Sequence, residues 1–571
     1  MENLAYHAIP MHIHSIHERE ASMEGQMYNA HRLGIHYMWF TDHDTRMGPK
    51  KYEACGYDFE KCKLLDERPG EDVASRLAYA VGVAQQAGFE LNETQIAQIS
   101  RRYVKPWTDG FRITADDGCA GELSEDAPHT GNCCMRLSAS GTDGAWRKVT
   151  ADWAASGKRD QTALTSVVTL RLWVRIPKPL GNHARLTLRI RLSQRPPDWH
   201  EAAVSYVMGR AEPGEVALPC SGDGWRELCI NPAVDAEGGM DNVFGGFSIT
   251  LESCGEPVEV YIDDVSKEAR YAWNDARREQ AKLARELGAR FDITPFVAAE
   301  ISGIGGDMNC FSTTVPIINY AERGYKVTRA EAVAHVRAHG GLISLNHPMA
   351  SYGAFKMTDE QREQVIRFES ERLAHERVYG ADLIEVGFVE GRAGFSMADH
   401  LRIWDAIGMA GVFVTGYGDS DAHTCRADWF DGNNYCGFIW GDGTEAGFTA
   451  SMKAGRMFFG DPAAFQGTAE YDADCAGIAV RMGQAVRIDA LTVTFRVSGG
   501  AEGTVRFIVD GVCAAERPVG ADFAETLEVT RAGMCTVVRA ELIRSDGRPV
   551  LLTNPIYLCD GTVEIPEERR V

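Results

Sequence analysis

A repeated alternation of apolar strands and amphipathic helices, interrupted once, sets the strongest limit on how this chain can fold. The alternation runs from residue 1 to about 108 and resumes at about 268. Between these stretches the pattern changes to short strands separated by Gly, Pro and Asp turns. Strands that alternate with helices pair in parallel, as a barrel or an open sheet. We therefore expect one α/β domain that is split in sequence by an all-β insertion.

The length of the chain supports a division into several domains. Its 571 residues exceed what one ordinary hydrophobic core holds. From about 465 to the end the pattern is again that of short strands, as in "ALTVTFRVSG" and "CTVVRAELIRS". We predict a barrel in two parts, 1–108 and 268–464, an inserted β-sandwich or jelly roll at 109–267, and a C-terminal β-sandwich at 465–571.

Local signals place several elements within the α/β part. An amphipathic pattern predicts a helix from Ser22 to Leu33, and Thr328 with Glu331 forms a capping box that opens a helix to His339. Apolar runs that end in polar residues predict the strands "IHYMWFTDHD", "ITPFVAAEIS", "GLISLNHP", "ADLIEVGF" and "GVFVTGYGDSDAH".

Charge and composition exclude several functions. The formal net charge is −22, which argues against nucleic acid as a partner because its backbone requires basic surfaces. A small phosphorylated substrate is compatible with this net negative charge, since a metal ion can supply local positive charge. No stretch approaches the ~20 apolar residues of a membrane helix. No secretory signal is visible, and the 15 cysteines contain no C-x-x-C, so we expect a cytoplasmic protein.

Polar clusters follow the predicted strands of the α/β part. His12 and His14, and likewise Asp421 and His423, are two residues apart, which places both side chains on one side of an extended strand. Glu300 is a lone acid at the end of an apolar strand. Such clusters converge at the carboxyl ends of strands in parallel α/β folds. The full set of predicted ligands from these clusters is His12, His14, His43, Glu300, His347, Asp421 and His423.

Imidazole and carboxylate ligands in this mixture predict a site for divalent metal ions. They suit Zn, Mn or Fe, and they outnumber the ligands of one tetrahedral ion, so two or three ions are expected. A single buried histidine is more often a hydrogen-bonded core residue than a ligand. Five histidines and two acids that all follow strands of one α/β pattern are better explained by metal binding. Asp419, in the turn before Asp421, faces the same way in this interpretation, with its role left open.

The order of these motifs resembles the polymerase-and-histidinol-phosphatase (PHP) superfamily. The shared features are H-x-H near the N-terminus, then "TDHD", a strand-ending Glu, "NHP" and "GDSDAH". "AGRMFFGDP" and the later "LLTNPIYL" are similar to the branch typified by carbaryl and carbofuran hydrolases. The resemblance covers about 1–65 and 285–571. It implies a distorted (β/α)7, TIM-like barrel with two or three metal ions.

The resemblance also implies roles for individual residues, with two departures from the family pattern. His12, His14, Glu300 and Asp421 would hold one ion, and Glu300 would bridge to a second ion that His347 also holds. His43 and His423 would hold a third ion or complete the cluster. The acid or histidine expected after H-x-H aligns with Glu18, and His17 competes for that place. In "GDMN", Asp307 replaces the expected histidine, so the second ion either has a carboxylate ligand or a weakened site.

The insertion carries a separate signal. "GWRELCI" and "VEVYIDDVSKE" resemble jelly rolls of carbohydrate-binding modules, and a structural role for the insertion is the competing interpretation. Tryptophans in this region could form a stacking platform for a sugar, although Trp in a sandwich is more often part of the core. They are Trp146, Trp153, Trp173, Trp199 and Trp225.

These observations predict a metal-dependent hydrolase that uses a metal-bridging hydroxide. Asp42 and Asp44 would orient His43 or move a proton, as carboxylates behind metal ligands commonly do. There is no G-x-S-x-G sequence for a serine nucleophile. The expected substrate is a small or sugar-linked phosphoester. The alternatives are a carbamate or carboxylic ester, or a glycan-binding protein whose metal site is structural or vestigial.

Overall fold

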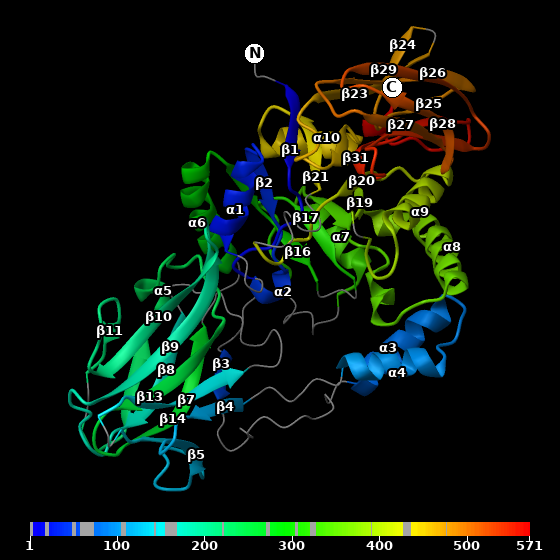
Figure 1. Cartoon of the computed structure of the whole chain (residues 1–571). Coiled ribbons are helices and arrows are strands. Elements are labelled where there is room, and N and C mark those ends of the chain that lie inside the picture. The colour runs from blue at the N-terminus through cyan, green and yellow to red at the C-terminus, as the bar shows by residue number, and fades with distance from the viewer. Residues whose placement is uncertain are drawn as a thin grey trace.

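The protein has a mixed α/β fold with a large share of β-sheet and few helices. The computed structural model describes residues 4–17, 22–47, 53–57, 73–103, 110–141, 144–154, 168–219, 222–269, 275–302, 306–319, 327–389, 391–425, 435–475 and 477–571. A central α/β region lies between a β-rich region that holds the C-terminus and a β-lobe formed by strands within 110–269 together with β3 (Glu53–Tyr57) (Figure 1).

The central strands pair in a circuit. The strands β18, β19 and β20 are parallel neighbours, and β2 pairs in parallel with β15. An isolated bridge joins His43 to Glu300, and two more join Ile13 to Phe40 and to Ala422, so the pairing returns to its start. These strands are β2 (Tyr37–Phe40), β15 (Thr294–Val297), β16 (Ala299–Ile301), β17 (Met308–Phe311), β18 (Leu342–Leu345), β19 (Leu383–Gly387) and β20 (Thr415–Gly418).

A strand that was not predicted, β17, departs from the parallel pairing expected of the central strands. This strand runs antiparallel to both of its neighbours, β16 and β18. Only residues 302–307 connect β16 to β17. Because a parallel connection needs a crossover of a dozen residues or more, so short a link requires the chain to turn back.

Helices flank the central strands, and capping residues explain where several of them begin. The predicted helix after Ser22 and the predicted capping box at Thr328 are both confirmed. Similar capping boxes open α8 and α9, at Thr358 and Ser396. The helices are α1 (Met23–Arg32), α2 (Asp44–Met47), α6 (Asp275–Phe291), α7 (Arg329–Ala338), α8 (Asp359–His375), α9 (Met397–Met409) and α10 (Glu445–Ala454), with short 3-10 turns η2 (Ala350–Ala354), η3 (Arg377–Gly380) and η5 (Glu567–Arg569).

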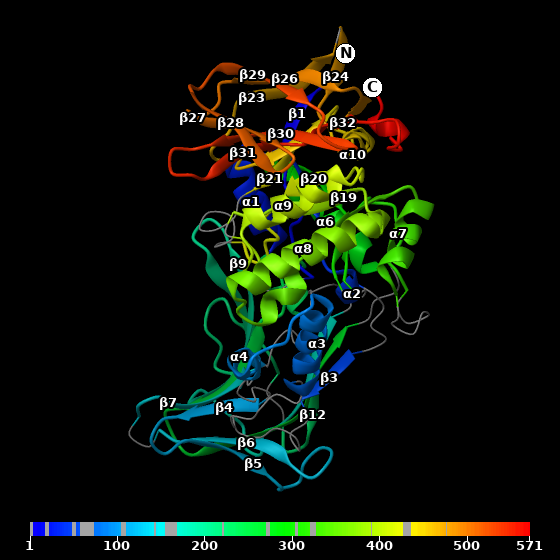
Figure 2. The same ribbon diagram turned by 90° about the vertical axis from the view of Figure 1, so that its right-hand side faces the viewer.

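A pair of helices before the β-lobe packs against this region. The helices are α3 (Val73–Gln86) and α4 (Glu93–Tyr103). Gln95 Nε2 donates to Lys356 O at 2.9 Å, and Gln364 Nε2 of α8 donates to Gly88 O at 2.9 Å. These bonds attach α3 and α4 beside α8, as Figure 2 also shows. No helix among the described residues is long and apolar enough to cross a membrane.

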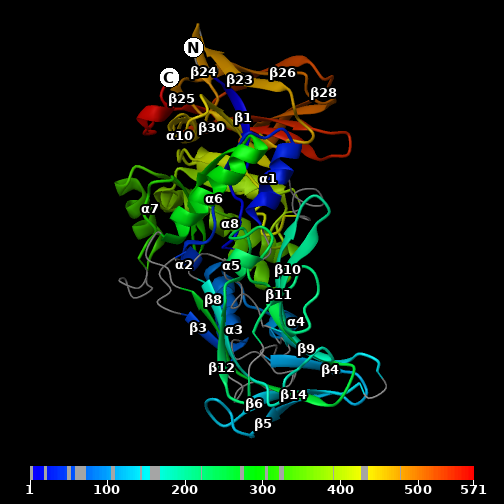
Figure 3. The same cartoon turned by 90° about the vertical axis from the view of Figure 1, so that its left-hand side faces the viewer.

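The β-lobe consists of two packed sheets (Figure 3). Alternate residues of its strands face inward, for example Leu172 and Val174 of one sheet and Leu188 and Ile190 of the other, and all four belong to one buried cluster. One sheet contains β11 (Val216–Ala217), β10 (His200–Gly209), β9 (Ala184–Arg195), β13 (Gly246–Ser253), β7 (Arg147–Ala154) and β4 (Gly110–Ala115). The other contains β12 (Arg226–Ile230), β8 (Val168–Arg175), β14 (Val258–Ala269), β6 (Cys134–Ala139), β5 (Ala120–Ser124) and β3 (Glu53–Tyr57), and a short helix α5 (Pro232–Asp235) lies in the lobe.

Most of the lobe's tryptophans are already engaged within the protein. Trp153 is buried between the sheets, and Trp173 stacks on His129 with ring centroids 3.8 Å apart. Trp225 Nε1 donates to Ala127 O at 3.0 Å. Trp146, by contrast, is 42% exposed. This arrangement gives little support to the predicted stacking platform.

The lobe is attached to α1 through a buried ion pair. Asp241 accepts hydrogen bonds from Met23 N at 2.7 Å and Glu24 N at 2.9 Å, which satisfies two free amides at the start of the helix. Arg195 Nη1 donates to Asp241 at 2.7 Å and to Glu24 at 3.1 Å. Arg195 and Asp241 are both buried.

The C-terminal strands form two sheets around a buried apolar cluster. The larger sheet also takes in β1, so the N-terminal strand pairs with β21 (Figure 1). It contains β1 (Ala5–Ile9), β21 (Cys436–Gly441), β22 (Met457–Gly460), β31 (Pro549–Thr553), β30 (Cys535–Ile543), β27 (Gly503–Val509), β28 (Val512–Val519), β25 (Ala485–Arg487) and β32 (Ile556–Cys559). The smaller sheet contains β24 (Ile478–Arg481), β23 (Thr468–Cys475), β26 (Ala490–Ser498) and β29 (Phe523–Thr530).

Asn554 connects this C-terminal region to β20. Its Oδ1 accepts from Gly416 N at 2.8 Å, and its Nδ2 donates to Gly416 O at 2.9 Å and Met457 O at 2.7 Å. All of these groups are buried. The side chain therefore holds the strand that leads to Asp421.

Replacing Asn554 by alanine is expected to lower the free energy of unfolding by at least about 2 kcal/mol, because buried backbone groups lose their partners. Midpoints of urea unfolding of the two proteins measure the loss. Asn231→Ala, which removes the cap of the short helix α5, is the matched control, with an expected loss of about 1 kcal/mol. Equal midpoints for Asn554→Ala and the unaltered protein would contradict the assignment.

Candidate metal centre

His12 and His14 face the interior of the strand circuit. Ile13 between them bridges to Phe40 and Ala422 and packs in an apolar cluster, so the two histidines turn to the opposite side. Both are fully buried, and their ring centroids are 5.2 Å apart. The expected placement of both side chains on one side is confirmed.

Glu300 lies at the centre of four histidines. Its Oε1 is 3.3 Å from His12 Nε2 and 3.5 Å from His347 Nε2. Its Oε2 is 2.8 Å from His43 Nδ1 and 3.6 Å from His14 Nε2. One carboxylate therefore gathers histidines that come from three separate strand ends of the chain.

Asp421 and His423 join the same cluster from the end of β20. Asp421 Oδ1 is 2.8 Å from His14 Nε2 and 3.3 Å from His12 Nε2. The ring of His423 is centred 4.2 Å from that of His14. The structure thus brings together all seven ligands predicted from the strand ends.

Three groups of these side chains have the spacing of metal ligands. In each group, one potential ligand atom per residue lies within 4.8 Å of the others. His14 and His43 each belong to two groups, so the three groups lie next to one another. The groups are His12, His14 and Asp421; His14, His43 and His423; and His43, Glu300 and Asp307.

The departure at Asp307 places a carboxylate where a ligand is expected. Asp307 Oδ2 lies 3.7 Å from His347 Nε2, and Asp307 belongs to the third ligand group. Of the two candidates after H-x-H, Glu18 lies outside the described residues. His17 is buried and is absent from all three ligand groups of the described part of the chain.

Three other acids stabilise the segments that carry the ligands. Asp42 accepts from Ser15 N and Ser15 Oγ, both at 2.6 Å. Asp44 Oδ1 accepts from Ser302 N at 3.1 Å. Asp419 accepts from Met11 N, just before His12, and burial raises the pKa of Asp419 to about 8. The expected role of Asp42 and Asp44 in proton movement stays a prediction.

Sequence reasoning missed Glu385, which orients His12. Its Oε1 is 3.0 Å from His12 Nδ1, and its Oε2 accepts from His347 N at 3.0 Å. A proton on His12 Nδ1 leaves Nε2 to face the cluster, the arrangement that carboxylates behind metal ligands impose. The sequence did contain a signal for Glu385, because it is a lone acid in the buried strand "LIEVG", as Glu300 is in its own strand.

Two further residues of the cluster were not predicted. Asn346 Nδ2 donates to Glu300 Oε1 at 2.8 Å. Arg392, from the segment after β19, makes an ion pair with Asp421 Oδ2. Asn346 precedes His347 in the "NHP" motif, whereas Arg392 belongs to no motif of metal ligands.

Backbone conformation at two ligands is unusual. His347 has φ 26° and Asp421 has φ 50°, in the left-handed region that residues with a Cβ seldom adopt. Such conformations cost of the order of 1–3 kcal/mol each and occur often at functional sites. They occur here after β18 and β20, at two of the strand ends that contribute side chains to the cluster.

Neighbouring side chains of the cluster have pKa values that are shifted in opposite directions. Burial lowers the pKa of His12, but Glu385 and Glu300 outweigh it and raise that pKa to about 10. The pKa of His14 is well below its ordinary value, because of burial and the neighbouring His423 and His43. Burial raises the pKa of Glu300, yet His43 and His12 hold it well below its usual value.

The donor set fits divalent metal ions. Among the described residues, His12 Nε2, His14 Nδ1 and Glu300 Oε2 are buried polar atoms that make no hydrogen bond of good geometry. Each such atom costs of the order of 1–3 kcal/mol, which coordination of a cation would offset. Mixed imidazole and carboxylate ligands suit Zn, Mn or Fe.

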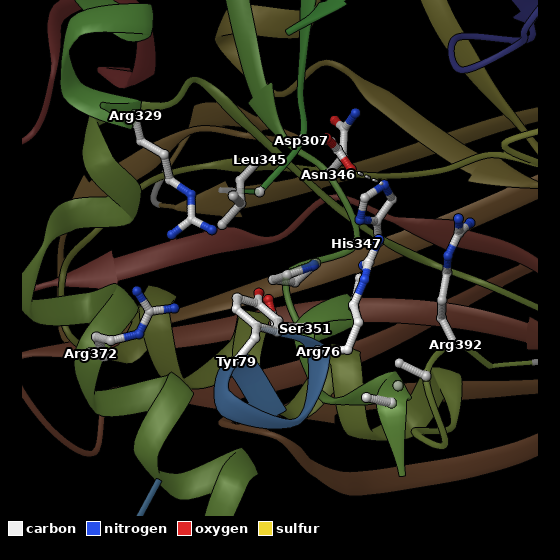
Figure 4. Close-up of a pocket in the computed structure, with 16 residues that line it drawn as sticks. Arg76, Tyr79, Asp307, Arg329, Leu345, Asn346, His347, Ser351, Arg372 and Arg392 are labelled. Atoms are coloured by element: carbon white, nitrogen blue, oxygen red, sulfur yellow. Dashed lines mark ion pairs between the residues drawn. The ribbon is translucent and has the colours of Figure 1, made fainter. Parts of the chain in front are cut away.

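A cavity of about 440 Å³ opens beside His347 and Asp307. Arginines dominate the charged part of its lining (Figure 4). They are Arg76, Arg329, Arg372 and Arg392.

Glu385→Gln is expected to weaken metal binding and any metal-dependent turnover by about 10–100-fold, because the amide cannot fully replace the carboxylate behind His12. Competition with a chelator of known affinity measures the metal dissociation constant, and thermal unfolding tests whether the fold is retained. Unchanged metal affinity in a folded variant would remove Glu385 from the site.

Comparisons with known proteins assign this chain to no family. No protein-family model matches it, and no curated protein matches it. A family 11 carbohydrate-binding module from Clostridium thermocellum, solved with a β-1,3-1,4-mixed-linked tetrasaccharide, is 10% identical over 28% of this chain and 87% of the module, with a TM-score of 0.18.

Two glycoside hydrolases match over a longer stretch. The Endo-D glycoside hydrolase domain from Streptococcus pneumoniae R6 is 6% identical over 79% of this chain and 38% of that chain, with a TM-score of 0.19. A β-1,2-glucanase from Parabacteroides distasonis is 7% identical over 80% of this chain and 37% of that chain, with a TM-score of 0.20. Because these TM-scores are below 0.5, these similarities support no conclusion about the fold or function of this chain.

Proposed function

We propose that the protein is a metal-dependent hydrolase that cleaves a phosphoester of a small molecule. The observation that carries the proposal is the convergence of five histidines and two acids on one buried cluster next to a cavity. Residues from distant strand ends contribute to it, and a purely structural role would not require so many ligands. They are His12, His14, His43, Glu300, His347, Asp421 and His423.

The chemistry of the site follows from this donor set. Divalent ions held by these residues and Asp307 would polarise the scissile group and lower the pKa of a coordinated water. Glu385 fixes the orientation of His12, and Asp419 ties the segment before His12 to β20. Arg392, paired with Asp421 and lining the cavity, is placed to meet an anionic oxygen of the substrate.

The arginines favour a phosphoester over a neutral ester. The chain as a whole carries a net charge of −22, whereas the charged lining of the cavity consists chiefly of guanidinium groups. Guanidinium groups match phosphate oxygens in geometry and charge. A carbamate or carboxylic ester, the alternative implied by the resemblance to carbaryl hydrolases, lacks that charge.

We also propose that the central strands form the distorted barrel of the PHP superfamily. The circuit of pairings through Ile13, β2, β16, β18 and β20 supports this interpretation. The parallel order of β18, β19 and β20 is a further support, while antiparallel β17 is the distortion.

A hydrolysis panel tests the proposal. Aryl phosphate mono- and diesters are compared with aryl carboxylic and carbamic esters, in added Mn or Zn and with a chelator, while metal content is measured separately. We expect chelator-sensitive turnover of phosphates and at least about one ion per chain. Turnover confined to carboxylic or carbamic esters would favour the alternative substrate. A folded protein that holds fewer ions and cleaves nothing would overturn the proposal and direct attention to glycan binding by the β-lobe.

A further inference from the structure

One side of the cavity, which we call the cationic side, carries more positive charge than the cleavage of a simple phosphoester requires. Its lining contains four arginines and one acid, Asp307. The chain as a whole has a net charge of −22, so this concentration of positive charge is not explained by its overall composition. A pocket lined by one sign of charge raises the local concentration of ligands of the other sign.

Two of the arginines lie against one tyrosine ring. The guanidinium carbons of Arg329 and Arg372 are 4.8 Å and 5.5 Å from the ring centroid of Tyr379. Arg329 Nη1 also donates to Tyr379 OH at 2.8 Å. Burial and the nearby charge of Arg372 both lower the pKa of Arg329. An anion in contact with these guanidinium groups would offset part of that positive charge.

Neighbouring residues fix the positions of these arginines. Arg372 is paired with Glu369 and with Glu376, and Glu369 also accepts from Tyr352 OH at 2.8 Å. These contacts hold one guanidinium in place before a ligand arrives, which reduces the entropy cost of binding.

The cationic side and the metal centre belong to one cavity. A Cβ on Gly306 would overlap Arg329 Nη2, so Arg329 packs directly on the backbone next to Asp307. Arg329 and Arg372 lie on one side of the cavity, and His347 and Arg392 lie on the other (Figure 4). Arg76 and Tyr79, both exposed residues of α3, complete the wall.

We propose that Arg329 and Arg372 bind a second anionic group of the substrate, one that is not cleaved. The substrate is then a small phosphoester that also carries a carboxylate or another phosphate. This inference rests on the proposed function, because it assumes that the ester reacts at the side of His347 and Asp307. It adds the substrate class: molecules with two anionic groups.

Binding of uncleavable probes tests the inference without relying on turnover. Calorimetry on the metal-loaded protein compares phenylphosphonate with 4-carboxyphenylphosphonate and with benzene-1,4-bisphosphonate. We expect the probes with two anionic groups to bind about 10-fold or more tightly, because charge-assisted bonds to guanidinium are strong. The carboxylate and bisphosphonate probes distinguish which second anion the cavity prefers.

Variants locate the effect. Arg329→Gln and Arg372→Gln are each expected to reduce the preference for two anionic groups to within about 2-fold, since each loses charge-assisted bonds. Arg496→Gln, on β26 and paired with Asp472, is the matched control and should keep the full preference. Equal affinity for all three probes, or a preference that both cavity variants retain, would overturn the inference.

Turnover separates this inference from the proposed function. Phenyl phosphate and 4-carboxyphenyl phosphate are the matched substrates. Selective binding of the two-anion probes without cleavage of either phosphate would retain the anion site and overturn the phosphoesterase proposal. Cleavage of both phosphates with equal kcat/KM would retain the phosphoesterase and overturn the second anion site.

Discussion

Glu300→Gln is expected to remove most of the metal from the protein and to lower turnover by more than the ~10–100-fold typical of residues behind the ligands. Glu300 contacts four histidines, and glutamine keeps its size while removing the negative charge that a cation requires. Metal content after dialysis, measured by elemental analysis, checks the first effect, and the hydrolysis panel checks the second.

A matched acid outside the cluster provides the control for Glu300→Gln. Glu445 accepts hydrogen bonds from Thr313 N at 2.8 Å and Thr313 Oγ1 at 2.6 Å and belongs to none of the ligand groups in the described part of the chain. Glu445→Gln should retain its metal. If both variants held as much metal as the unaltered protein, the central role of Glu300 would be wrong.

Arg539→Met is expected to destabilise the protein by about 3–5 kcal/mol, because it leaves buried carboxylates without their cation. Arg539 of β30 donates to both oxygens of Asp405 of α9, at 2.8 and 2.9 Å, and also pairs with Glu541. All three residues are buried. The midpoint of urea unfolding reports the loss.

Two further variants show whether charge burial is the cause. Arg506→Met removes an exposed pair with Glu516 and should cost less than about 1 kcal/mol. In the double variant Arg539→Met with Asp405→Leu, one uncompensated charge is gone, so part of the loss should be recovered. A double variant less stable than Arg539→Met alone would contradict this explanation.

The sequence could predict several residues of the cluster because these leave a local trace. Two residues separated by one position along an extended strand share a side, so spacing placed His12 with His14. Asp421 and His423 also meet, although they follow the end of β20 and Asp421 has a φ of 50°. A lone acid in an apolar strand identified Glu300, and the same criterion applied to "LIEVG" would have identified Glu385.

Other features depend on contacts that no local pattern encodes. The antiparallel direction of β17 follows from the short link before it, and the periodicity of a strand is the same in either direction. Arg392 reaches Asp421 from an irregular segment, and Arg329 reaches the cavity from the first turn of α7. Arginines are common on protein surfaces, so their gathering in one cavity becomes visible only when the chain is folded.

The wide sequence separation of the ligands has a consequence for synthesis of the protein. His14 meets Asp421 across 407 residues, so the cluster cannot close until the chain beyond Asp421 has left the ribosome. At the usual 5–20 residues per second, that interval lasts about 20–80 seconds. The β-lobe, whose strands pair mostly among themselves, has time to fold within it. Early in synthesis His12 and His14 lack their partners in the cluster, and under the proposed function tight metal binding becomes possible only after Asp421 has emerged.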